Sequence, residues 1–231
     1  MEETLTPRRR DVGGLSTIQF DGPQGAATIV LFHGYGADAA DLAPLAFELD
    51  LPTPARWAFP DAPLPLEGGV GRAWFSIDVS AIERAQRTGQ SVDLSGPEPA
   101  GLAQARVAAG RFLQELGVPW SRLILGGFSQ GAMLAVDLAL RAPENPRGLI
   151  ILSGNLLCAD SWRKLAAARK GLPFFQSHGR SDPILGYAGA RKLEVLLTEA
   201  GLEGSLLNFD GGHAIAPIVL ERMREFLSRL A

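Results

Sequence analysis

Ser129 is the first residue of this chain whose type and surroundings could do chemistry. It lies in the stretch GGFSQGA, where Gly127 and Gly131 stand two residues away on either side. A serine at a tight turn between a strand and a helix takes strained backbone torsions, and such a turn needs small residues at those two positions. The spacing therefore indicates a serine nucleophile. The motif alone is weak, because a chain with 27 glycines among 231 residues can match it by chance.

The segments on either side of Ser129 give the motif the context that a nucleophile needs. The apolar run RLILGG has the length of a strand, and QGAMLAVDLAL after it has helical periodicity. The first N–H groups of a helix have no partner within the helix, and its dipole is positive at that end. We therefore predict that the backbone N–H of Gln130 stabilises negative charge formed beside Ser129.

A second N–H donor is expected from the loop that follows the predicted strand at 27–32. This loop reads HGYGAD, is rich in glycine and leads into a predicted helix. Such a loop completes the oxyanion hole, the pair of N–H donors that binds the negative oxygen formed during acyl transfer. The backbone N–H of Tyr35 is the candidate.

A serine hydroxyl needs a base to take its proton, and the usual base is a histidine held by a carboxylate. Of the three histidines, His33 begins the glycine-rich loop and is expected to shape it, whereas His178 ends a predicted strand. His213 follows the last predicted strand. With Ser129 and Asp182 it gives the chain order nucleophile, acid, base, and each of these three follows a strand end. We predict that the three residues meet at one edge of the sheet, with His213 as the base.

Asp210 is a rival for the acid, because it precedes His213 by only three residues in FDGGH. An aspartate in such a glycine-rich turn commonly bonds the backbone of its own turn. Asp182 lies instead in the short loop HGRSDP, where Pro183 restricts the backbone after it. A rigid loop can hold a carboxylate against an imidazole. The sequence therefore favours Asp182.

These positions require a sheet whose strands end together. Apolar runs of strand length alternate with longer segments of helical periodicity, which predicts an α/β fold with a parallel sheet covered by helices on both faces. The predicted strands are 27–32, 55–59, 122–127, 148–154, 172–178 and 205–210. The predicted helices are 38–49, 99–117, 130–142, 189–201 and 218–230.

The segment 60–98 does not follow this alternation. It mixes proline, glycine, aromatic and charged residues without a sustained period, and it has too few apolar residues for a core of its own. Long excursions in a small domain are usually functional or mobile. We expect residues 1–231 to form one domain in which 60–98 covers the active site.

Composition excludes several classes of partner. The net charge of −3 and pI near 5.7 give no reason to expect nucleic acid, and the basic run at 8–10 is expected to be a solvated terminal patch. No segment approaches the roughly 18 apolar residues of a membrane helix, so stable membrane insertion is not expected. The start MEETLTPRRR lacks the pattern of a secretory signal, which makes the cytoplasm the expected location.

No cofactor is expected either. Cys158 is the only cysteine, which excludes an internal disulfide and a cysteine-rich metal site. The histidines lack the spacing of HExxH, and the carboxylates, Asp61, Asp78 and Asp93 among them, show no ligand pattern. The glycines of GGVG and GYGA do not form GxGxxG after a strand, so a nucleotide site is not expected.

Five motifs in order, LFHGYGAD, RAWFSID, GGFSQGA, HGRSDP and GGHAI, resemble the phospholipase/carboxylesterase family of α/β-hydrolases, which includes the acyl-protein thioesterases. The resemblance spans the chain from about residue 27 to its end and implies an α/β-hydrolase fold, a mostly parallel central sheet with helices on both faces. It implies a Ser129, Asp182 and His213 triad with Tyr35 and Gln130 N–H groups in the oxyanion hole. Trp74 and Phe75 match a Trp-Phe pair that lies beside the acyl site. Residues 79–98 depart from the family pattern.

The function expected from these residues is that of a serine carboxylesterase that acts on small-molecule esters through an acyl-enzyme. Short to medium acyl chains are expected, because Trp74, Phe75 and the apolar residues of 63–66 would line a limited groove. An acyl-protein thioesterase or a lysophospholipase would use the same triad. A hydrolase-like binding protein without turnover is the alternative from a different class. The resemblance implies a monomer or a homodimer.

Overall fold

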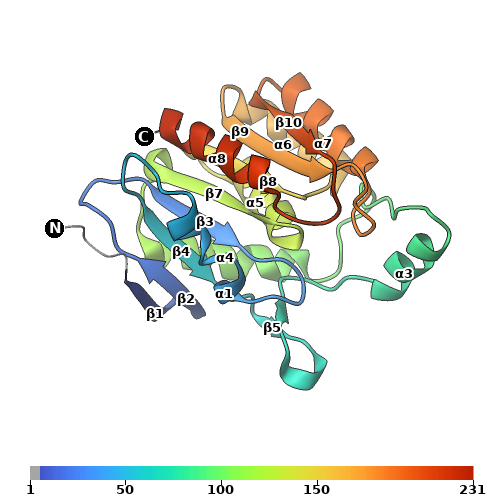
Figure 1. Ribbon diagram of the computed structural model, residues 1–231, viewed down its shortest axis with the longest axis horizontal. Coiled ribbons are helices and arrows are strands. Elements are labelled where there is room, and N and C mark those ends of the chain that lie inside the picture. Colours follow the sequence, from blue (N-terminus) through green and yellow to red (C-terminus); the bar gives the residue numbers. More distant parts are fainter. Residues whose placement is uncertain (1–5, 231) are drawn as a thin grey trace.

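The computed structural model describes residues 6–230, and in this part of the chain eight strands form one central sheet (Figure 1). The strand order is β1-β2-β4-β3-β7-β8-β9-β10. The bounds are β1 Pro7–Val12, β2 Leu15–Phe20, β3 Thr28–Phe32, β4 Arg56–Pro60, β7 Leu123–Phe128, β8 Gly148–Leu152, β9 Pro173–Gly179 and β10 Glu203–Phe209. β1, β2 and β4 pair antiparallel, and every other neighbouring pair is parallel. The predicted α/β fold with a mostly parallel sheet is confirmed.

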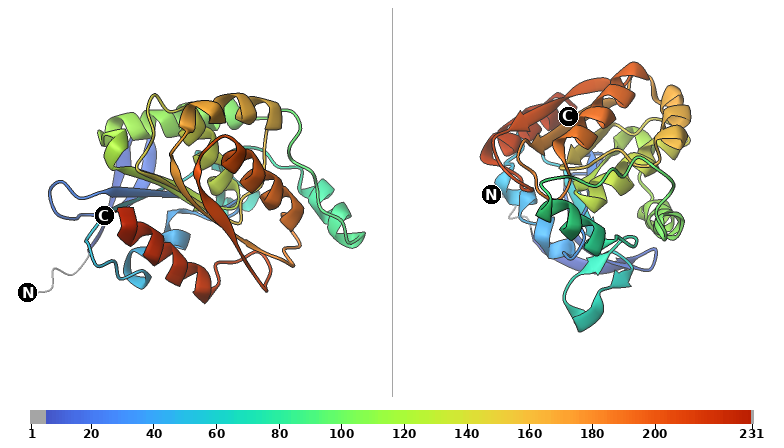
Figure 2. Two further views of the ribbon diagram at one scale, coloured as in Figure 1. Left: turned by 90° about the horizontal axis from the view of Figure 1, so that it is seen from above. Right: turned by 90° about the vertical axis from the view of Figure 1, so that its right-hand side faces the viewer.

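Helices cover both faces of this sheet, as Figures 1 and 2 show. Their bounds are α1 Ala39–Leu42, α2 Leu45–Glu48, α4 Leu102–Leu116, α5 Gln130–Arg141, α6 Ala159–Ala166, α7 Tyr187–Glu199 and α8 Pro217–Leu230. Short 3-10 helices span Glu67–Gly69, Trp120–Arg122 and Ala167–Arg169. One apolar core joins the sheet to α4, α5, α6 and α7, and a second joins the opposite face to α1, α2 and α8.

The strand sequences supply both cores, because successive side chains of a strand point to opposite faces. In β3, Val30 and Phe32 belong to the first core, whereas Ile29 and Leu31 belong to the second. All five residues of this strand are buried. A strand buried on both faces carries apolar residues at consecutive positions, which is why these runs could be predicted from the sequence.

Several elements differ from the sequence prediction. The helix expected at 38–49 is two short helices, α1 and α2, because Pro44 has no N–H to continue the first one. The basic run at 8–10, expected as a terminal patch, belongs to the edge strand β1. Its residues are exposed and polar, so the strand has no apolar pattern. The helix α6 was also not predicted.

The segment 60–98 contains short elements that the sequence did not predict. A hairpin joins β5 (Leu64–Pro65) to β6 (Arg72–Ala73), and a helix, α3, spans Val79–Arg87. No residue of α3 is buried, which explains the absence of a core-facing apolar pattern. Figure 1 and the left view of Figure 2 show α3 standing away from the sheet. Within residues 6–230, no helix has the length and apolar character needed to cross a membrane.

Candidate active site

Ser129 lies at the turn between β7 and α5, with φ of 54° and ψ of −117°. Few residues other than glycine adopt a positive φ without strain. The two flanking glycines make the turn possible. A Cβ atom on Gly131 would lie 2.0 Å from the carbonyl oxygen of Phe32, and one on Gly127 would lie 2.5 Å from the same oxygen. The G-x-S-x-G spacing is therefore a steric requirement of this turn.

The backbone of Ser129 is anchored while its side chain remains available. Its N–H donates to the carbonyl oxygen of Leu152 at 2.8 Å, and its own carbonyl accepts from Met133 N at 3.2 Å. Within the described part of the chain, the hydroxyl makes no hydrogen bond. Hydrogen bonds between a nucleophile and its base are often long in free enzymes and tighten only with substrate bound.

Asp182 and His213 meet at the carboxyl ends of β9 and β10. His213 Nδ1 lies 2.6 Å from Asp182 Oδ2, while Asp182 Oδ1 accepts from the backbone N–H groups of Ile184 at 2.8 Å and Leu185 at 2.9 Å. Since an ionised carboxylate only accepts, Nδ1 carries the hydrogen and Nε2 is left as the basic nitrogen. This tautomer is the one that a general base requires.

The environment of Asp182 keeps its carboxylate ionised. Burial raises the pKa of Asp182, but hydrogen bonds from His178, His213 and the Leu185 N–H outweigh it and bring the pKa well below its usual range. The rival Asp210 has a 98% exposed side chain, and its nearest charged partner is Arg180 at 3.9 Å. The structure thus brings Asp182, and not Asp210, to the imidazole of His213.

Ser129 and His213 line the same cavity, whose volume is about 320 Å³. The Phe128 ring packs against the His213 imidazole, with ring centroids 4.8 Å apart. Apolar side chains from several elements form most of the wall: Ile77, Val79, Ile82, Phe128, Met133, Ile184 and Leu185. The cavity can hold an apolar acyl group next to the hydroxyl of Ser129.

Two backbone N–H groups beside Ser129 have no hydrogen-bond partner among residues 6–230, those of Tyr35 and Gln130. Tyr35 lies in the loop after β3, and Gln130 is the first residue of α5. The Gln130 side chain is buried, and its amide accepts from Trp74 N and donates to Phe75 O, each at 2.8 Å. Both N–H groups are thus left unused by the fold, as donors to a substrate oxygen would have to be.

The loop that carries Tyr35 is fixed by the hairpin of β5 and β6. Gly36 N donates to Arg72 O, and Arg72 N donates to Ala37 O, both at 2.9 Å. A Cβ atom on Gly71 would lie 2.0 Å from the carbonyl oxygen of Gly36, so this close approach needs glycine. The hairpin therefore holds the Tyr35 N–H in place.

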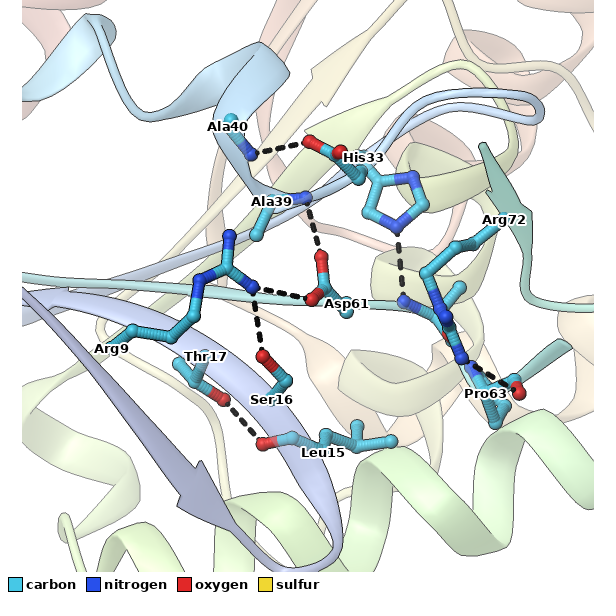
Figure 3. A network of polar contacts seen from close by, with 12 residues as sticks. Arg9, Leu15, Ser16, Thr17, His33, Ala39, Ala40, Asp61, Pro63 and Arg72 are labelled. Carbon is cyan, nitrogen blue, oxygen red and sulfur yellow. Dashed lines mark hydrogen bonds and ion pairs between the residues drawn. The ribbon is translucent and has the colours of Figure 1, made fainter. Parts of the chain in front are cut away.

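His33 shapes this loop, as predicted from its position. Its Nδ1–H donates to Gly34 O at 2.7 Å, and its Nε2 accepts from Ala62 N at 3.0 Å, a bond drawn in Figure 3. Burial lowers the pKa of His33, although the bond to Gly34 opposes this effect. Nearby, Asp61 accepts from Ala39 N at 2.8 Å and from Arg9 at 2.7 Å (Figure 3). Arg9 comes from the edge strand β1, whose polar sequence did not predict a strand.

Comparisons with known proteins bear on the family and the fold of this chain. The sequence profile of the phospholipase/carboxylesterase family matches residues 15–231. The chain belongs to this family. An acyl-protein thioesterase 1 from Eremothecium gossypii is 30% identical over 208 residues, which cover 86% of this chain and 85% of the relative.

Solved structures of similar proteins have the same α/β-hydrolase fold. The esterase PE8 is 29% identical, with a TM-score of 0.76 over 94% of this chain and 99% of that one. A carboxylesterase from Mesorhizobium loti is 21% identical, with a TM-score of 0.74 over 96% of this chain and 98% of that one, and at this identity the likeness shows the fold alone. The predicted family and the predicted fold are confirmed.

The Trp-Phe pair of the phospholipase/carboxylesterase family does not line the cavity in this chain. Trp74 and Phe75 are only 1% and 2% exposed and belong to the core. Trp74 Nε1 donates to the carbonyl oxygen of His33 at 3.0 Å, so Trp74 supports the start of the loop that carries Tyr35. The expected role of both residues in substrate contact is corrected, because a match to a family motif does not decide which way each side chain points.

Residues 63–66, which were also expected to line the groove, are not among those that line the cavity. They lie on the β5 hairpin, and Leu64 is 43% exposed. Instead, this part of the wall is formed by Ile77 and by Val79 and Ile82 of α3. Of these, only the two residues of α3 lie in the part of the chain that departs from the family pattern. Within the described part of the chain, no group of three His, Cys, Asp or Glu residues could hold a metal ion.

Proposed function

We propose that this member of the phospholipase/carboxylesterase family is a serine carboxylesterase of short- to medium-chain esters. One observation carries the proposal: Ser129, on its strained turn, lines the same cavity as His213, whose Nδ1 lies 2.6 Å from Asp182 Oδ2. A nucleophile, a base with its Nε2 free and a carboxylate behind that base are the parts that acyl transfer to serine requires.

In the proposed reaction, Ser129 Oγ attacks the ester carbonyl carbon while His213 Nε2 takes the hydroxyl proton. The N–H groups of Tyr35 and Gln130 donate to the oxygen that becomes negative. The C–O bond to the alcohol then breaks, and His213 returns the proton to the leaving oxygen. A water molecule releases the acid from Ser129 by the same steps, so proton and charge balance over the cycle.

The size and lining of the cavity support short to medium acyl chains. Its volume of about 320 Å³ lies at the lower end of the roughly 300–1,000 Å³ typical of ligand sites. The apolar wall favours burial of methylene groups, each worth about 0.8 kcal/mol. Substrate preference is proposed to come from α3 and not from Trp74 and Phe75.

Acyl-protein thioesterase activity is the second candidate, because the similar protein from Eremothecium gossypii carries that name. A thioester would react at Ser129 by the same steps, as would a lysophospholipid. A binding protein without turnover is the alternative from another class. A cytoplasmic location and a monomeric or homodimeric state remain predictions.

A fluorophosphonate probe tests the proposal directly. We expect covalent labelling of Ser129 in the wild type and none in Ser129→Ala, with both proteins folded by circular dichroism. A wild type that is not labelled would support the binding-protein alternative. A panel of p-nitrophenyl esters, acyl-thioesters and lysophospholipids, compared by kcat/KM, then decides between esterase, thioesterase and lysophospholipase.

A further inference from the structure

His178 is a completely buried histidine that the proposed mechanism does not use. It lies near the end of β9, four residues before Asp182, and does not line the cavity that holds Ser129. A residue that cannot reach the substrate cannot act as the base. Its contacts must explain why the fold buries a polar ring at this position.

The Nε2 atom of His178 faces two acceptors. It lies 2.6 Å from the carbonyl oxygen of Leu185 and 3.1 Å from Asp182 Oδ2. Neither acceptor can donate, because a carbonyl oxygen has no hydrogen and the lowered pKa of Asp182 keeps its carboxylate ionised. Nε2 therefore carries the hydrogen. Nδ1 is buried and has no hydrogen-bond partner in the part of the chain that the structure describes.

Two imidazoles consequently meet at one carboxylate oxygen. Asp182 Oδ2 is 2.6 Å from His213 Nδ1 and 3.1 Å from His178 Nε2, while Asp182 Oδ1 is held by two backbone N–H groups. The single Nε2–H of His178 is shared between its nearer acceptor, Leu185 O, and Asp182 Oδ2, so both oxygens of the carboxylate face donors. Removing the donor of His178 would leave Oδ2 attached only to His213, which has to change its own charge during the reaction.

We propose that His178 is a positioning residue for acyl transfer, whose Nε2–H holds Asp182 Oδ2 in line with His213 Nδ1. Through its contact with Leu185 O, the same ring fixes the loop that places Ile184 and Leu185 on the cavity wall. The inference rests on the proposed function, since it assigns His178 to the same triad.

Two substitutions separate positioning from mere packing. His178→Gln keeps an amide N–H near the place of Nε2, whereas His178→Asn is one methylene shorter and puts its amide near the place of Nδ1. We expect His178→Asn to lower kcat by roughly 10- to 100-fold with KM within about twofold, as when a residue behind a catalytic group is removed. His178→Gln should recover most of that loss. Thermal unfolding and circular dichroism confirm that each variant folds.

A spectroscopic measurement supplies a readout that packing alone would not move. The proton between His213 Nδ1 and Asp182 Oδ2 should give a far-downfield proton NMR signal, assigned by its loss in His213→Ala. We expect this signal to shift or broaden in His178→Asn and to persist in His178→Gln. If His178→Asn does not fold, the Gln variant still decides, because its loss of kcat or of the signal would overturn the proposal.

Other outcomes also overturn it. Wild-type kcat and an unchanged signal in His178→Asn would show that Asp182 needs no such support, while labelling of Ser129 in the wild type would leave the proposed function standing. Complete loss of labelling in His178→Asn, with the signal unchanged, would make His178 the base. An unlabelled wild type would remove the proposed function itself.

Discussion

At the scale of the residue, hydrogen bonding and burial distinguish the two candidates for the triad acid. Asp182 accepts hydrogen bonds from two backbone N–H groups and from His213, whereas the Asp210 side chain is 98% exposed. Proximity in sequence would favour Asp210, but the two glycines after it turn the chain so that His213 faces the neighbouring strand end. Mutations at the two aspartates should therefore have unequal effects.

We expect Asp182→Asn to lower kcat by roughly 10²- to 10⁴-fold, because an amide in place of the carboxylate favours the wrong tautomer of the base. Asp210→Asn should cost at most about tenfold, through the turn it supports. Steady-state kinetics on one ester at one pH, with circular dichroism as the folding control, measures both. The reverse ranking would assign the acid to Asp210.

The lowered pKa of Asp182 predicts how its contribution to stability depends on pH. Burial raises this pKa, but the hydrogen bonds from His178 and His213 lower it by more than burial raises it. The folded protein therefore binds the proton more weakly than the unfolded chain. The stabilisation is then complete above the unfolded value of about 3.9 and is lost as pH falls below it. The difference in unfolding free energy between wild type and Asp182→Asn should stay constant from pH 8 to about pH 5 and shrink below about pH 4. Denaturant titrations check this; a gap that narrows as pH rises would contradict it.

At the scale of the element, the turn between β7 and α5 requires glycine, whereas a position within helix α4 that also carries glycine does not. A Cβ on Gly131 would lie 2.0 Å from Phe32 O, but one on Gly110 in α4 meets nothing within 4 Å. Gly131→Ala should greatly reduce folding or labelling of Ser129. Gly110→Ala, the matched control, should stabilise the protein by about 0.4–1 kcal/mol, because alanine restricts the unfolded chain and favours helix. Thermal unfolding measures both, and equal behaviour would contradict the steric argument.

The helix α3 lines the cavity but buries no residue, so it should affect substrate preference more than stability. Ile82→Ser should lower kcat/KM for a hexanoyl ester by roughly 10-fold and leave an acetyl ester nearly unchanged, because a longer chain loses apolar contact. Arg87→Ala, on the same helix but away from the cavity, serves as the control. Equal losses on both esters would place the acyl chain elsewhere.

At the scale of the whole molecule, one sheet contains strands that range from residue 7 to residue 209, which supports a single domain.

The charge around the cavity is negative. The net charge of the chain is −3, and the charged residues that line the cavity include Asp41 and Glu83 but no lysine or arginine among those described. Neither carboxylate has an ion-pair partner within residues 6–230. An anionic substrate therefore meets like charge at the site.

This charge predicts discrimination between thioesters of the same acid. Butyryl-coenzyme A, which carries phosphate groups, should have a kcat/KM at least about tenfold below that of the neutral N-acetylcysteamine thioester, since repulsion acts before any bond changes. The double substitution Asp41→Asn and Glu83→Gln should bring the ratio of these two kcat/KM values closer to one, as should added salt. A ratio near one in the wild type would show that these carboxylates do not face the substrate.

Local patterns in the sequence determined the parallel sheet, the glycine turn around Ser129 and the family. Backbone torsion angles and the periodicity of burial depend on residues that are close together in the sequence. The order of residues along the chain also pointed to Asp182 and His213. The catalytic roles of these two residues remain predictions. Only the tertiary structure decided that Trp74 and Phe75 belong to the core and that α3 lines the cavity. It alone joined Arg9 to Asp61 across 52 residues and placed His178 against Asp182. Such contacts depend on which faces of distant elements meet, and no local period carries that information.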